Sequence, residues 1–404
     1  MTKSAFRWVA LTAAAASLAI GSGVSLAQKG PALTKAVQKA LAGADAASKK
    51  KNFTECVAKG REAEAVPNRT ANDNNMIAEV LGYCFVQQRD YANATRYYEQ
   101  TLGNVTGNVL EQRVRAISQM YNVQGNYAKA IEYGQRAIKG GFADSDMYII
   151  VGQAYYRQGD YKTTAKFVGD YVNSIERNGN TPKEALLLIV FDSCRRLSDD
   201  ACTTNTLEKL VRHYQKEDYW KNLMISIFRS GATGDRATLQ LYRLASEVNA
   251  MPRPQYYVEM AQLAIEGGFP GEAQSIAENV IAKKLFTEKA DTERVNRLLA
   301  SAKARAATDK PQLTAEAGRA KSGESLVRLG EAYMGYGMLP QAVDALTRGL
   351  AAPGVKNPPD ALLVLGIAQF KAGNKADALK SFGAVKGDAG LERLARLWSL
   401  RAQG

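Results

Sequence analysis

The residues of this chain that could do chemistry are few, and they do not form a catalytic pattern. His213 is the only histidine in 404 residues. Ser-His-Asp, Cys-His and multi-histidine metal arrangements therefore have at most one candidate base or ligand. The histidine lies in the helical-looking segment 210–214, where a structural role is the simpler interpretation. We predict no catalytic residue, no metal ligand and no cofactor.

Two short motifs resemble parts of enzyme sites. Asp199-Asp200 is a pair of carboxylates, and two carboxylates are enough for a glycosidase. Its position in an expected turn, just ahead of a helix, suits capping and the helix dipole instead. Gly335-Tyr336-Gly337 begins like a phosphate-binding loop, but Pro340 stands where the third glycine belongs. Neither motif indicates an enzyme.

The first 27 residues have the pattern of a secretory signal peptide. Lys3 and Arg7 form a basic start, an apolar run covers residues 9–20, and a small-x-small cleavage site occupies residues 25–27. The apolar run is far shorter than the ~20 residues that a membrane span needs. We predict cleavage of residues 1–27 and a periplasmic protein without a transmembrane segment after cleavage.

The four cysteines all lie in the mature chain, at positions 56, 84, 194 and 202. An exported protein lives in an oxidising compartment, so disulfides are expected, and four cysteines allow three pairings. Cys194 and Cys202 flank the expected turn at residues 197–201, and we predict a disulfide between them. A metal site is the alternative, although no Cys-x-x-Cys motif or histidine cluster accompanies the cysteines.

The chain carries a formal net charge of +13, which includes the two basic residues of the signal segment. A basic exported protein attracts anionic partners, such as acidic protein segments or an envelope polymer. The charge is spread along the chain, and residues 49–51 are the longest basic run. Few aromatic residues are interleaved with the basic ones, so together with export we predict no nucleic-acid partner.

The elements that must position any site repeat along the chain. Residues 124–127 (Gln-Gly-Asn-Tyr) and 158–161 (Gln-Gly-Asp-Tyr) are the same turn, and residues 88–91 (Gln-Arg-Asp-Tyr) are an earlier copy. A small residue recurs at one place in each unit, at Gly82, Ser118, Gly152, Gly330 and Gly366. The three copies of the turn begin at positions 88, 124 and 158. A nearly constant spacing of this kind indicates a repeat array in which neighbouring hairpins bury their apolar faces against one another.

This pattern resembles the tetratricopeptide repeat (TPR) family. The matching features are the small residue, an aromatic residue three positions later, the turn, and the alanine and aromatic residue of the second helix, as in Ala94/Tyr98 and Ala378/Phe382. The resemblance implies an all-α fold: a right-handed α-solenoid of stacked antiparallel helix hairpins, without β-sheet. It also implies that the small residues are buried where helices approach closely.

The repeat spacing predicts the organisation of the chain. Residues 28–302 form an N-terminal TPR-like array, and residues 303–322 are a degenerate repeat or a hinge, of which the spacing favours the repeat. Residues 323–404 form C-terminal repeats with a capping helix, whose apolar face is expected to carry Leu391, Leu394, Ala395 and Trp398. The gaps between clear repeats accommodate ten repeats in all.

The resemblance also implies contacts and a function. The second helix of the first repeat packs against the first helix of the second in this family, which implies a Cys56–Cys84 disulfide. First helices line a concave groove that holds peptides, and the matching positions here are Arg115, Gln119, Asn122, Gln153, Tyr156 and Arg157. Arg115, Tyr156 and Arg157 are expected to be exposed there.

These expectations together predict a non-enzymatic periplasmic scaffold or adaptor that binds a protein or peptide partner through the concave groove. The alternative is a protein that binds an anionic envelope polymer, such as peptidoglycan or an exopolysaccharide, or an accessory factor in envelope assembly. The basic net charge motivates this alternative.

Overall fold

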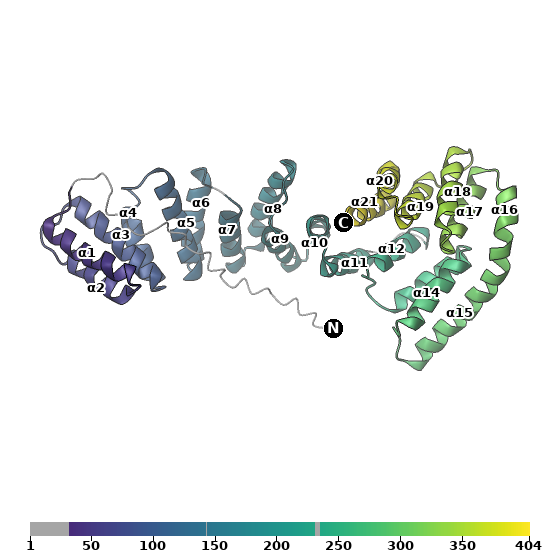
Figure 1. The fold of residues 1–404 in the computed structure, drawn as a ribbon, viewed down its shortest axis with the longest axis horizontal. Helices are drawn as coiled ribbons and strands as arrows, with labels where there is room; N and C mark the ends of the chain where they lie inside the picture. The colour runs from purple at the N-terminus through teal and green to yellow at the C-terminus, as the bar shows by residue number, and fades with distance from the viewer. Residues whose placement is uncertain (1–31, 143, 231–234) are drawn as a thin grey trace. The chain divides into compact units, whose positions relative to one another are not determined.

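A computed structural model describes residues 32–142, 144–230 and 235–404, and over these residues it is helical with no strand (Figure 1). The predicted all-α fold of helix hairpins is confirmed. The signal peptide expected at residues 1–27 lies outside the described residues. Within the described ranges, no helix combines the length and the apolar character that crossing a membrane requires. The chain divides into two compact units at Asp199/Asp200.

Unit 1 is a run of helices in which each first helix packs against the second helix that follows it. The hairpins α1/α2, α3/α4, α5/α6 and α7/α8 are of this kind, and α9 follows them. The helices of unit 1 are α1 (Lys35–Lys49), α2 (Phe53–Glu64), α3 (Ala71–Gln87), α4 (Tyr91–Thr101), α5 (Gly107–Val123), α6 (Tyr127–Lys139), α7 (Ser145–Arg157), α8 (Tyr161–Arg177) and α9 (Glu184–Arg196).

The turn inside each hairpin has a constant design. One residue of the turn takes a positive φ, and the side chain of the residue directly after it caps the second helix. Gly125 and Gly159 have φ values of +77° and +82°, and Arg89 adopts the same conformation at +61°. The residue after each of them accepts a hydrogen bond from the backbone N–H three positions on, which satisfies one of the open donors of the helix start. These capping residues are Asn52, Asp90, Asn126 and Asp160.

The small residues of the repeat are buried at close helix contacts, as predicted. A Cβ added at Gly152 in α7 would lie 2.5 Å from Cγ2 of Val168 in α8. Gly366 meets the ring of Phe382 in the same way, at 2.4 Å. Ser118 is fully buried and donates a hydrogen bond to a backbone carbonyl of the second helix at 2.7 Å. Gly82 and Gly330 complete the set.

The first two hairpins are also joined covalently. Cys56 in α2 and Cys84 in α3 form a disulfide with a Cα–Cα distance of 5.9 Å, which confirms the predicted pair. Cys194 and Cys202 are in the disulfide form too, so no cysteine of the described residues is free.

Unit 2 contains hairpins of the same kind, including α13/α14, α17/α18 and α19/α20. The helices of unit 2 are α10 (Asp200–Tyr214), α11 (Glu217–Ser230), α12 (Asp235–Glu247), α13 (Gln255–Glu266), α14 (Pro270–Ala282), α15 (Lys289–Asp309), η1 (Lys310–Gln312), α16 (Leu313–Arg319), α17 (Gly323–Gly335), α18 (Leu339–Ala351), α19 (Pro358–Lys371), α20 (Lys375–Ala384) and α21 (Ala389–Gln403).

The segment 303–322, predicted to be a degenerate repeat or a hinge, departs from the hairpin design. It holds the end of the long helix α15, the short 3-10 turn η1 and the seven-residue helix α16. Leu313 is the buried residue of α16, so this short helix has little apolar surface to pack. The helices on either side of this segment in the chain, α14 and α17, contact each other directly.

The last helix caps the C-terminal repeats and also closes unit 2 on itself. Leu391, Leu394, Ala395 and Trp398 are buried, which confirms the predicted apolar face of α21. Besides α19 and α20, α21 contacts α10 and α12, from the start of the unit. The closure therefore joins the two ends of unit 2, and polar side chains reinforce it.

Three polar contacts hold α21 on α10 and on the residue that follows it. Arg393 and Arg396 both pair with the carboxylate of Glu208, at 3.0 Å each. The Gln215 side chain donates to the backbone carbonyl of Leu400 at 2.8 Å. Glu208 is buried, so two guanidinium groups compensate the loss of its water contacts.

Candidate functional site

The surface of unit 1 formed by α3, α5, α7 and α9 carries the residues predicted to bind a partner. We call it the first-helix face. Successive first helices contact one another there, α5 with α7 and α7 with α9, whereas second helices do not pack on one another to a comparable extent among the described residues.

Ion pairs and hydrogen bonds link neighbouring helices across this face. Arg113 in α5 forms two hydrogen bonds with the carboxylate of Glu79 in α3, at 2.5 and 2.8 Å, and both side chains are largely buried. Lys183 pairs with Asp146 at 2.8 Å, at the step from α7 to α9. The two-point contact between Arg113 and Glu79 is the stronger kind, because two hydrogen bonds fix the relative orientation of the groups in addition to the attraction of opposite charges. They fix one repeat against the next.

Two of the predicted binding residues belong to these links. Arg115 is half-buried and pairs with Asp144 at 2.5 Å and with Glu111 at 3.2 Å. Tyr156 is half-buried and donates its hydroxyl to the carboxylate of Asp192. Burial raises the pKa of Tyr156, and the hydrogen bond to Asp192 raises it further. The expected exposure of these two side chains is wrong, because bonds between repeats already engage them.

The other four predicted residues are open. Arg157 is exposed, as expected, and Gln119, Asn122 and Gln153 are half-buried. Within the described residues none of these four side chains has a hydrogen bond or an ion pair. Gln119 and Gln153 each directly follow the small residue of their repeat, so they occupy equivalent places on α5 and α7. The structure thus leaves a row of unused amides on the first-helix face, ending at a guanidinium.

Sequence reasoning missed the residues that engage the predicted ones. Asp192 and Arg196 in α9 both reach Tyr156, with Arg196 Nε donating to the tyrosine oxygen at 3.3 Å. They lie one repeat further along the chain. Comparing charges at the same position of successive repeats would have suggested the contact, because the fold places those positions side by side.

In unit 2, side chains of α12 bind residues of the first helices α17 and α19. Arg236 in α12 binds Glu331 in α17 at 2.5 Å and Asp360 in α19 at 2.7 Å. Gln240 donates to the other oxygen of Asp360 at 2.9 Å.

The residues considered for catalysis lie in helices, at a helix start or in a turn, where the repeat fold accounts for them. His213 is half-buried in α10, and the pair Asp199-Asp200 stands where α10 begins, as expected for a capping role. Gly337 has a φ of +71° in the turn between α17 and α18, which accounts for that glycine. No group of three or more possible metal-binding side chains occurs among the described residues.

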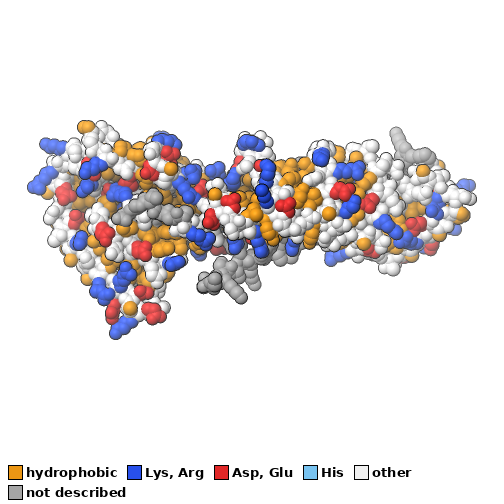
Figure 2. All heavy atoms as spheres, turned by 180° about the vertical axis from the view of Figure 1, so that it is seen from behind, with side chains coloured by type: hydrophobic (Ala, Val, Ile, Leu, Met, Phe, Trp, Pro, Cys, Tyr) orange, Lys and Arg blue, Asp and Glu red, His pale blue; other side chains and the backbone are white. Residues whose placement is uncertain are grey.

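Charged side chains are intermixed over the visible surface. Figure 2 shows lysine and arginine scattered among aspartate and glutamate on one face of the molecule, with no large basic patch there. The diffuse charge expected from the sequence is seen on this face.

Residues 360–388 match a family model described as a tetratricopeptide repeat. No curated protein matches the sequence. Among solved structures, the chain is similar to a chain of the Naa15/Naa10 complex bound to HypK-THB, with 13% identity and a TM-score of 0.39, over 87% of this chain and 54% of that chain. This chain thus spans about half the length of that one.

Two further solved structures are similar in the same loose sense. A tetratricopeptide repeat protein from Parabacteroides merdae shares 11% identity with a TM-score of 0.35, over 67% of this chain and 99% of that chain. The TPR domain of P58(IPK) shares 11% identity with a TM-score of 0.25, over 91% of this chain and 98% of that chain.

Proposed function

We propose that this tetratricopeptide-repeat chain is a non-enzymatic scaffold that holds an extended segment of a protein partner on the first-helix face of unit 1. The observation that carries the proposal is the row of unused amides, Gln119, Asn122 and Gln153, with Arg157 at its end. A primary amide offers both donors and an acceptor. Such groups match the alternating N–H and C=O groups of an extended peptide backbone.

The surrounding charges favour a backbone ligand over a polyanion. Arg113 and Arg115 are neutralised by carboxylates of this chain, which leaves Arg157 as the predicted cation that is open. One open guanidinium can bind one carboxylate of a partner, whereas a charged polymer is held by many cations acting together. An anionic envelope polymer is therefore the second candidate, and the basic net charge of the whole chain is what favours it.

The experiment selects peptides from a random display library with the wild-type protein, and then compares their affinity for variants. We expect the double variant Gln119→Ala/Gln153→Ala to bind the selected peptides about tenfold more weakly or worse, since two ligand hydrogen bonds are lost. Gln100→Ala is the matched control, because Gln100 is an exposed amide on the second helix α4. It should bind like the wild type.

Two results would overturn the proposal. One is a set of selected peptides whose affinity the double variant does not change. The other is a protein that selects no peptide but sediments with purified peptidoglycan, which would favour the polymer function.

We also propose that the scaffold works in the periplasm. The Cys56–Cys84 disulfide supports an oxidising compartment, where such bonds persist. Fractionation of the native host should release the protein by osmotic shock, with a mass that corresponds to cleavage after Ala27. A full-length protein in the cytosolic fraction would contradict this location.

A further inference from the structure

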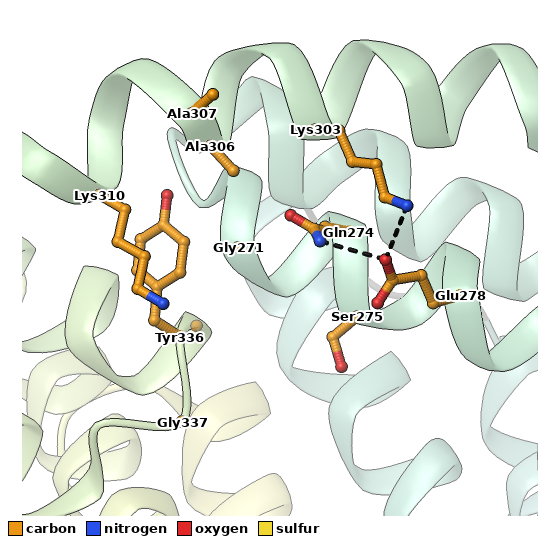
Figure 3. Close-up of a pocket in the computed structure, with 11 residues that line it drawn as sticks. Gly271, Gln274, Ser275, Glu278, Lys303, Ala306, Ala307, Lys310, Tyr336 and Gly337 are labelled. Atoms are coloured by element: carbon orange, nitrogen blue, oxygen red, sulfur yellow. Dashed lines mark hydrogen bonds and ion pairs between the residues drawn. The ribbon is translucent and has the colours of Figure 1, made fainter.

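We infer that unit 2 holds a second peptide-binding site, in a cleft between α14, α15 and the end of α17, and that its ligand is an extended segment carrying an acidic side chain. This site lies on a different unit from the first-helix face and uses other chemistry. Its test is therefore independent of the proposed function. Figure 3 shows the cleft and the residues that line it.

The cleft exists because the repeat around residues 303–322 is incomplete. α15 is 21 residues long, but only η1 and the seven-residue α16 follow it. A second helix of ordinary length would lie along α15, as α18 lies along α17. The missing length leaves a hollow of about 490 Å³. Ligand pockets usually measure roughly 300–1,000 Å³, so this volume suits a short segment.

The aromatic wall of the cleft is held in place on three sides. The ring of Tyr336 packs on the backbone of α14 at Gly271, where an added Cβ would lie 2.5 Å from the ring. Its hydroxyl donates to Asp309 at 2.7 Å, and burial raises the pKa of Tyr336. The ammonium of Lys310 lies 5.6 Å from the ring centre. Because Tyr336 is fixed before any ligand arrives, the wall costs little ordering on binding.

Two charged side chains of the cleft, Lys303 and Glu278, already pair with each other. Lys303 pairs with Glu278 at 3.1 Å, and Gln274 donates to the same carboxylate at 3.1 Å, as the dashed lines of Figure 3 show. These hydrogen bonds, that of Gln274 first, lower the pKa of Glu278. Glu278 therefore remains ionised at neutral pH, with its charge offset by Lys303.

Lys310 is the open cation. It is exposed and lies across the ring of Tyr336, and no carboxylate pairs with it in the part of the chain that the structure describes. The residues that line the cleft include two lysines, Lys303 and Lys310, and one carboxylate, that of Glu278. An acidic side chain of a ligand could bind the ammonium while its aliphatic part contacts the tyrosine ring.

The rest of the lining suits a peptide backbone. The side chains of Ala306 and Ala307 are small, so the main chain of a ligand could approach the α15 side of the cleft closely. The amide carbonyl of Gln274 points toward Ala306 in Figure 3, and Ser275 also lines the cleft, so both can supply hydrogen-bonding groups. The cleft thus combines a cation, an aromatic wall and polar groups over a span that fits a few residues of extended chain.

The test measures binding of a short fluorescein-labelled peptide that alternates glutamate with serine, by anisotropy, with the full mature chain. We expect Lys310→Glu to weaken binding about tenfold or more, because it replaces attraction by repulsion. Ala307→Glu should weaken it similarly, because it adds a carboxylate to the cleft wall at an exposed position. Circular dichroism melts verify that both variants are folded.

Lys375→Glu is the matched control. Lys375 is an exposed lysine at the start of α20 in the same unit and does not line the cleft. It changes the net charge equally and should bind like the wild type. Equal weakening by Lys375→Glu and Lys310→Glu, or unchanged binding of both cleft variants, would overturn the inference. So would tighter binding of polygalacturonate than of the peptide, because the site would then recognise an acidic glycan.

Discussion

Arg236 and Glu331 form an ion pair at 2.5 Å although they lie 95 positions apart in the chain. The same guanidinium binds Asp360, and both carboxylates are almost fully buried, with 1% and 3% of their side-chain surface exposed. Arg236 itself is 41% exposed. One half-exposed cation on α12 therefore compensates two buried anions on α17 and α19.

Arg236→Ala should destabilise unit 2 strongly. Removal of the cation leaves two buried carboxylates unpaired, and breaking a buried pair in this way costs roughly 3–5 kcal/mol. The described tryptophans, Trp220 and Trp398, both lie in unit 2, so their fluorescence during urea unfolding follows this unit. Arg328→Ala is the control, since it breaks an exposed pair with Glu324 that is worth about 1 kcal/mol or less. Equal losses for the two variants would contradict this account.

The pH dependence of stability should reveal Glu331. Burial raises the pKa of Glu331 above its usual value of 4.5, and the nearby guanidiniums of Arg236 and Arg243 only partly oppose this. The folded state then holds the proton more tightly than the unfolded state. The contribution of Glu331 to stability is most favourable below pH 4.5 and falls as the pH rises through the folded pKa.

Urea unfolding of the wild type and of Glu331→Gln at a series of pH values checks this. The free energy of unfolding of the wild type, minus that of the variant, should decrease as the pH rises above 4.5. The subtraction removes the opposite trend of the carboxylates whose pKa is lowered, such as Asp73 and Glu64. A difference that grows with pH would show that the ion pair with Arg236 outweighs burial.

Two glycines of one hairpin should respond in opposite directions to the same substitution. Gly152→Ala places a Cβ 2.5 Å from Val168, and overpacking of this kind costs about 1–3 kcal/mol. Gly169 lies in the helix α8 with no neighbouring atom within 4 Å of an added Cβ. Gly169→Ala should therefore gain about 0.5–1 kcal/mol from helix propensity. Thermal melts by circular dichroism measure both, and a stable Gly152→Ala would contradict the repeat register.

Loss of the Cys56–Cys84 disulfide should destabilise the first two hairpins. The bond spans 28 positions, and the chain-entropy relation gives a contribution of about 3.6 kcal/mol for a loop of this size. Cys56→Ala/Cys84→Ala should lower the melting temperature of unit 1, and reduction of the wild type should do the same. Peptide mapping without reduction should recover this pair and the predicted Cys194–Cys202 pair. Recovery of a mixed pairing would contradict the prediction.

The helix hairpins and their close contacts can be predicted from the sequence, because similar residues recur at equivalent positions of successive repeats. A small residue such as Gly152 and the turn around Gly159 recur at a fixed period, and the structure places both as expected. The apolar face of α21 is predictable for the same reason, since it follows the helical period around Trp398. These features depend on neighbours within about one repeat.

The candidate sites were predicted less completely, because their side chains are engaged by residues outside their own repeat. The repeat register places Arg115 on the first-helix face, but it does not show that Asp144 neutralises it. The contact of α12 with α17 and α19 depends on Arg236 meeting two carboxylates that no periodic pattern connects to it. The segment 303–322 was expected to be a degenerate repeat or a hinge, and the repeat spacing does not show that a cleft lies beside it.

The closure of unit 2 has a consequence for the order in which the chain folds. The polar contacts described above within unit 1 join positions at most 40 apart, so its hairpins can add one after another as they are made. Glu208 meets Arg393 and Arg396 across 185 and 188 positions, and contacts of such high order slow folding. Unit 2 therefore cannot finish before the last helix has been synthesised, and until then the face of α10 that receives α21 stays uncovered.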